Sequence, residues 1–277
     1  MHALLPRAGG CAALAAPVIM WTEFFTHALT RQGYDLLTRP FSDLATRGTP
    51  NASEFAVGFF LIPGILTVVV GLGLWFSTRE GQAWRLGSIL IIAAGVFLFA
   101  TGVFQQDPGS YLAGLLHGTM SQTCFAIASV APLVLFFGSM RHNHLGAPRR
   151  LWLAAGLAAL AIEGIGLAIR PLAAYPDGLF QRPFSIVLTI WFVATGAWLI
   201  RLATLPSPTT TMCPSTDSTR PPAANRSRAL TTASTIAAVS TGTSAMLTTT
   251  STAPTTWTAT GLSGSGLAAP NVLNTVR

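Results

Sequence analysis

Residues 55–76 read FAVGFFLIPGILTVVVGLGLWF, an apolar stretch without an ionisable side chain. A helix of this length covers about 33 Å, enough to cross the hydrocarbon core of a bilayer, which is about 30 Å thick. Its Pro63-Gly64 pair interrupts the helical hydrogen bonding, and within a membrane only packing against neighbouring helices can compensate for that break. The stretch therefore predicts a membrane-spanning helix that packs inside a bundle.

Five further apolar segments share this character. The six predicted spans cover residues 9–29, 55–76, 86–104, 112–140, 151–169 and 184–202. Only 9% of the residues are charged whereas 51% are hydrophobic, and the mean hydropathy is +0.54, values far from those of soluble domains. The sequence predicts an all-α polytopic membrane protein, a six-transmembrane-helix bundle over residues 1–203, with the lipid bilayer as its main partner.

The first segment, residues 9–29, is the weakest of the six because Glu23 and His27 interrupt its last turns. A cleaved signal peptide is the alternative, since Ala8-Gly9-Gly10-Cys11 is similar to a lipoprotein cleavage site. Too few residues precede this site to form the apolar core of a signal peptide. A membrane span is therefore the favoured interpretation.

All sixteen basic residues are arginines, and they are scattered along the chain. This distribution argues against nucleic acid as a partner, because nucleic-acid binding needs basic side chains gathered on one face. The three cysteines have no spacing typical of a disulfide framework or a metal site.

The arginines also predict the orientation of the bundle. One side would receive Arg7, Arg79, Arg85, Arg141, Arg149, Arg150 and Arg201, and the other side Arg31, Arg39, Arg47, Arg170 and Arg182. Because arginine accumulates on the cytoplasmic side of a membrane, both termini are predicted to be cytoplasmic. We expect the protein to lie in the cell (plasma) membrane.

Residues 204–277 are rich in Ser, Thr, Ala and Pro, with one acidic residue, Asp217, and one aromatic residue, Trp257. Such a segment has too little apolar side chain to offset the entropy lost on folding. We expect a disordered C-terminal tail.

Short polar motifs lie at the span ends on the predicted outer face. They are Ser42-Asp43-Leu44, Phe104-x-x-Asp107, Leu116-His117 and Gln181-Arg182. In this order, and with this number of helices, the chain resembles over about residues 8–203 the six-helix integral membrane family catalogued as domain of unknown function 998. It departs from the family pattern at Ala45, where a glycine usually follows Ser-Asp-Leu, and this departure bears on the turn geometry alone. The resemblance implies the six-helix fold and a shared polar face, without an established activity.

Two carboxylates, an imidazole and a guanidinium are expected to meet at this face. Asp107 and His117 flank the short loop of an antiparallel hairpin, so we expect Asp107 to orient His117. Asp43, in the long first loop, is expected to form a bidentate ion pair with Arg182. The candidate site comprises Ser42, Asp43, Asp107, His117, Gln181 and Arg182.

Three functions fit this combination of residues. The network can hold the first loop on the bundle, or it can bind a lipid headgroup or a small polar solute, with Arg182 and Ser42 as contacts to an anion. Alternatively, Asp43, Asp107 and His117 can hold a metal in a membrane-embedded hydrolase. The sequence contains neither a His-Glu-x-x-His nor a Gly-x-Ser-x-Gly motif. No catalytic residue is assigned, the sequence requires no cofactor, and a non-enzymatic binding protein is favoured.

Glu163 lies in the middle of the fifth predicted span. An ionisable group in lipid is costly unless it faces the bundle interior and finds a partner, and Ser121, Gln122 and Thr123 on the fourth span are the expected partners. Glu163 can serve as the relay of a proton-coupled transporter, or it can be a protonated packing residue. The sequence leaves both interpretations open.

Overall fold

The computed structural model describes residues 4–77, 81–140, 148–169 and 177–205. Within these residues the chain forms helices and no strands. The elements are α1 (Leu4–Thr30), the 3₁₀ helix η1 (Phe41–Ala45), α2 (Ala52–Ala56), the π-helical η2 (Val57–Leu61), α3 (Ile62–Ser77), α4 (Gln82–Val103), α5 (Tyr111–Ser139), α6 (Arg149–Ile169) and α7 (Asp177–Thr204). Because α2, η2 and α3 form one continuous span, six helices are long and apolar enough to cross a membrane.

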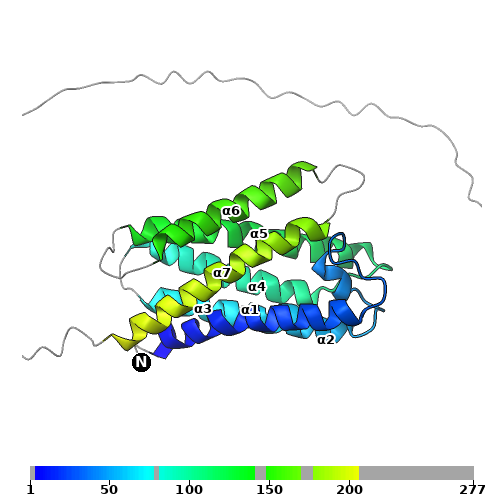
Figure 1. Ribbon diagram of the computed structural model, residues 1–277, viewed down its shortest axis with the longest axis horizontal. Helices are drawn as coiled ribbons and strands as arrows, with labels where there is room; N and C mark the ends of the chain where they lie inside the picture. The colour runs from blue at the N-terminus through cyan, green and yellow to red at the C-terminus, as the bar shows by residue number, and fades with distance from the viewer. Residues whose placement is uncertain (1–3, 78–80, 141–147, 170–176, 206–277) are drawn as a thin grey trace, which may run out of the picture. The chain divides into compact units, whose positions relative to one another are not determined.

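The spans run side by side along the long axis of the bundle (Figure 1). Each span packs against the next, and α7 returns to pack against α1, which closes the bundle. Neighbouring spans are antiparallel (Figure 1), and short connections join all of them except the first pair, which residues 31–51 join. The start of α1 and the end of α7 therefore lie at one end of the bundle, called the terminal end here. Residues 31–51 lie at the opposite end, called the loop end.

Glycines set the closest helix contacts at the terminal end. A Cβ added to Gly9 would lie 2.8 Å from the Cα of Gly73 on α3, and a Cβ added to Gly196 would lie 2.8 Å from the carbonyl oxygen of Gly10. Lipid tails are as apolar as leucine, so helices in a membrane associate through such close packing rather than through hydrophobic burial. These glycines allow α1 to approach α3 and α7 at the same level.

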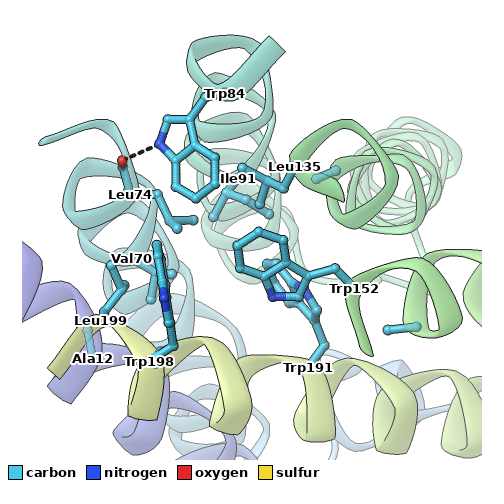
Figure 2. Close-up of a cluster of buried hydrophobic side chains, with 13 residues drawn as sticks. Ala12, Val70, Leu74, Trp84, Ile91, Leu135, Trp152, Trp191, Trp198 and Leu199 are labelled. Atoms are coloured by element: carbon cyan, nitrogen blue, oxygen red, sulfur yellow. Dashed lines mark hydrogen bonds between the residues drawn. The ribbon is translucent and has the colours of Figure 1, made fainter. Parts of the chain in front are cut away.

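Three tryptophans fill the bundle near the terminal end (Figure 2). The rings of Trp84, Trp152 and Trp198 have centroids 5.6–5.7 Å apart, and each ring comes from a different helix. Trp84 Nε1 donates to the carbonyl oxygen of Leu74 at 2.7 Å, and Trp152 Nε1 donates to Thr195 Oγ1 at 3.0 Å. The cluster joins α4, α6 and α7 with the polar edges of two of its rings satisfied.

The predicted fold class, a six-transmembrane-helix bundle, is confirmed. The main difference in bounds is that the sixth span begins at Asp177 rather than at residue 184. The predicted span began at residue 184, directly after Pro183, and proline usually breaks helices in soluble proteins. In the structure Pro183 lies within α7. Helices in a membrane bundle can contain a proline, because neighbouring groups satisfy the backbone carbonyl that it leaves without a donor. Gln181 and Arg182 therefore lie on α7 rather than in a loop.

The division into residues 1–203 and 204–277 stays a prediction, because residues 206–277 lie outside the described residues.

We predict that Gly196→Ala destabilises the protein by about 1–3 kcal/mol, because the added methyl group must displace the backbone of α1. Thermal unfolding of the purified protein in detergent measures the effect. Gly164→Ala on α6 is the matched control, since nothing lies within 4 Å of a Cβ at that position. Equal melting temperatures for the two variants would contradict the close packing of α1 and α7.

Candidate functional site

The first loop folds onto the loop end of the bundle through Phe41, the first residue of η1. The Phe41 side chain is buried against Phe24 of α1 and Phe59 of η2, with ring centroids 4.8 and 4.9 Å away. Its backbone N–H donates to Gln181 Oε1 of α7 at 2.9 Å. One residue thus attaches η1 to three elements of the bundle.

Arg182 completes this attachment from α7. Its guanidinium carbon lies 5.3 Å from the ring centroids of both Phe24 and Phe41, a cation–π arrangement on two rings. Its Nη2 donates to the carbonyl oxygen of Arg39 at 2.9 Å and to the hydroxyl of Tyr34 at 3.2 Å. Burial raises the pKa of Tyr34 to about 12 although the nearby Arg182 charge lowers it, so the phenol stays protonated at neutral pH.

The start of α7 is shaped to hold this guanidinium. A Cβ at Gly178 would overlap Arg182 Nη1 and would lie within 3 Å of the carbonyl oxygens of Leu37 and Arg39. The backbone N–H of Gly178 donates to the carbonyl oxygen of Thr38 at 3.3 Å. The loop carbonyls thereby satisfy donors at the N-terminus of α7, which have no partner within the helix.

The ion pair expected between Asp43 and Arg182, and the contact expected between Asp107 and His117, are not formed. Asp43 pairs with Arg39 at 3.6 Å rather than with Arg182, and Asp107 pairs with Arg47 at 3.7 Å rather than orienting His117. The physical reason is exposure: all four side chains of these pairs are between 28% and 59% exposed, so water solvates the charges. Pairs of this kind contribute about 0–1 kcal/mol.

His117 is fully enclosed and bonds to the backbone. Its Nδ1 lies 3.1 Å from the carbonyl oxygen of Thr101 and 2.9 Å from that of Phe104, at the end of α4. Because a carbonyl only accepts, Nδ1 carries the proton, and Nε2 of the neutral ring is an acceptor. Nε2 is buried without a hydrogen-bond partner among the described residues.

A cavity of about 130 Å³ lies beneath the first loop, between α5, α6 and α7; it is called the loop-end cavity here. Its polar lining consists of Ser42, Gln106, His117, Ser121, Gln122, Glu163, Asp177 and Gln181. Of the predicted site residues, Ser42, His117, Gln181 and Glu163 line it. Asp43, Asp107 and Arg182 lie outside its lining, in the contacts described above.

Glu163 belongs to this cavity, which the sequence did not indicate. Gln122, one of its three expected partners, donates a hydrogen bond to Glu163 Oε1. Glu163 lies six residues before the end of α6 at Ile169, about 9 Å along the helix, and therefore near the loop end rather than in mid-membrane. The sequence did contain a signal for this position: Glu163 is only six residues from the outer end of its span, and that short distance could have linked it to the candidate site.

Asp177, Gln106 and Gln122 line the cavity although the sequence analysis did not assign them to the site. Asp177 was placed in a loop before the sixth span, and the structure makes it the first residue of α7. Its distance from the other site residues in sequence gave no sign of this position.

The predicted metal ligands are not assembled. In the described part of the chain, no group of three His, Cys, Asp or Glu side chains could hold a metal ion. Asp43 and Asp107 instead contact Arg39 and Arg47 on the exposed side of the loop.

The sequence of residues 14–198 matches the family model described as "Protein of unknown function (DUF998)". The chain belongs to the DUF998 family. The matched region contains every residue that lines the loop-end cavity, together with the Phe24, Phe41 and Arg182 contact. No curated protein and no solved structure matches the chain.

We predict that Arg182→Ala destabilises this DUF998 protein by about 2–3 kcal/mol, because both the cation–π contact and a charged hydrogen bond are lost. Thermal unfolding and the rate of protease cleavage within residues 31–51 measure the effect. Arg182→Lys should recover only part of the stability, since an ammonium group cannot lie flat on two rings. Arg201→Ala, at an exposed position of α7, is the control; an equal loss in both alanine variants would contradict the role of Arg182.

Proposed function

We propose that this multi-pass membrane protein binds a small polar solute, or the polar head of a lipid, in the loop-end cavity. The observation that carries the proposal is that Ser42, His117, Gln181 and Glu163 line one cavity of about 130 Å³. These residues come from η1, α5, α7 and α6, so the site exists only when the bundle and the loop are assembled. An engineered cavity of similar size, about 150 Å³, holds a molecule as large as benzene.

The charges of the lining favour a neutral or cationic ligand. The described lining contains two carboxylates, Glu163 and Asp177, and no arginine. The guanidinium of Arg182, expected to contact an anion, instead lies on Phe24 and Phe41. A carboxylate held in a partly enclosed site attracts an ammonium group or a hydrogen-bond donor more strongly than in water.

The proposal includes the orientation of the bundle in the cell membrane. Arg7, Arg85, Arg149, Arg150 and Arg201 all belong to the terminal end. The excess of arginine at this end supports a cytoplasmic location for both termini, which would open the loop end to the outside.

Proton-coupled transport is a second candidate function. It is favoured by the position of Glu163 in the same cavity as His117, because two protonatable groups beside a solute can couple its movement to a proton. A hydrolase with Asp43, Asp107 and His117 as metal ligands has no such support, since the two aspartates contact Arg39 and Arg47.

We predict that the protein in lipid nanodiscs binds radiolabelled methylamine saturably, and that Glu163→Gln weakens this binding about tenfold or more by removing a charge-assisted hydrogen bond. Acetate should not compete. Glu54→Gln is the matched control, because Glu54 is an exposed acid outside the cavity. Equal affinities for the wild type and Glu163→Gln would contradict the proposed site.

The same two variants separate binding from transport. In proteoliposomes with a pH gradient, the transport candidate predicts that the wild type and Glu54→Gln take up methylamine faster than protein-free liposomes do, and that Glu163→Gln takes it up no faster than they do. Uptake that is unchanged in Glu163→Gln would contradict it.

A further inference from the structure

The loop-end cavity is the first of three cavities in a row. A neck cavity of about 40 Å³ shares four lining residues with it: Ser42, Ser121, Phe125 and Gln181. A central cavity of about 80 Å³ shares five with the neck: Met20, Leu98, Cys124, Phe125 and Ser185. Phe125 of α5 lines all three, so its ring lies where the cavities adjoin.

The chemistry of the lining changes along this row. The loop-end cavity has two carboxylates and a histidine in its lining, whereas the central cavity is enclosed by apolar side chains such as Ile91, Ala94, Leu98 and Leu188. The central cavity lies among α1, α3, α4, α5 and α7, inside the bundle. An alkyl chain in an apolar cavity gains packing contacts with the side chains that line it.

The polar end of the row has hydrogen-bond acceptors in its lining. The carboxylates of Glu163 and Asp177 both line the loop-end cavity. A carboxylate accepts hydrogen bonds from an amine or a hydroxyl group, and an ammonium group adds an attraction between opposite charges.

We propose that the site binds a single-chain amphiphile with an amine or hydroxyl head. The head lies in the loop-end cavity against Glu163, and the alkyl chain passes Phe125 and Cys124 into the central cavity. This inference rests on the proposed function and specifies its ligand class: a polar group that carries an apolar chain, rather than a wholly polar solute.

A series of primary alkylamines, from methylamine to decylamine, tests the inference by competition with radiolabelled methylamine in nanodiscs. For the wild type, affinity should rise about fourfold for each methylene group until the cavities are filled. In Ala94→Leu, whose added side chain occupies the central cavity, methylamine should bind as in the wild type and the gain with chain length should be largely lost.

Two features of this experiment separate binding in the central cavity from other effects of chain length. Partitioning of alkylamines into the bilayer is the same for all variants and therefore cancels between them. Ala126→Leu on α5 is the matched control, because Ala126 is exposed on the bundle surface and lines none of the three cavities. It should retain the dependence on chain length.

The outcomes are distinct. Methylamine binding with the same dependence on chain length in the wild type and Ala94→Leu overturns this inference and leaves the polar site intact. Absence of methylamine binding overturns the proposed function, and the inference is then decided by the reactivity of Cys124 alone.

In a protein with Cys11→Ser and Cys213→Ser, decylamine should slow the alkylation of Cys124 by a small permeant maleimide at least fivefold, while methylamine should not. If decylamine does not slow the alkylation of Cys124, the inference is overturned. This measurement needs no Ala94→Leu protein, so it decides the inference even if that variant fails to fold.

Discussion

The guanidinium of Arg182, held on the rings of Phe24 and Phe41 and bonded to the carbonyl oxygen of Arg39, determines how the loop end is built. The carbonyl oxygens and aromatic faces around Arg182 replace the water that this guanidinium loses in the fold. These contacts of Arg182 hold the first loop over the bundle. Pro40 and Ser42 of this loop therefore line the cavity. The arginine therefore shapes the site without lining it.

The cavity combines this loop with a bundle whose other end is closed by glycines and tryptophans. The tight contacts of Gly10 with Gly196 and the ring cluster around Trp84 fill the terminal end. The three cavities lie instead beneath the loop and inward from it, along α5. Dense packing at one end and polar groups around space at the other are the arrangement expected of a binding site supported by a rigid scaffold.

The fold was predictable because lipid permits few solutions: apolar stretches such as residues 55–76 must be helices, and short connections make neighbours antiparallel. The site was predictable only in part. The sequence identified Ser42, His117, Gln181 and Glu163 as unusual, and the structure brings all four to one cavity. The partners of Arg182, Asp43 and Asp107 were wrong, because opposite charges were assumed to seek one another. In the structure Asp43 and Asp107 are 28% and 30% exposed and pair with other arginines, whereas Arg182 binds backbone and rings. Sequence order gives no measure of that exposure.

The most direct test of the binding cavity beneath the first loop is the reactivity of a single cysteine at position 42, introduced as Ser42→Cys with Cys11, Cys124 and Cys213 replaced by alanine. The rate of modification by a membrane-impermeant thiol reagent, applied outside intact cells, is measured with and without methylamine. The account predicts that the cysteine reacts from the outside, that methylamine slows the reaction, and that Glu163→Gln removes this protection. A rate that methylamine leaves unchanged at every concentration would contradict the account.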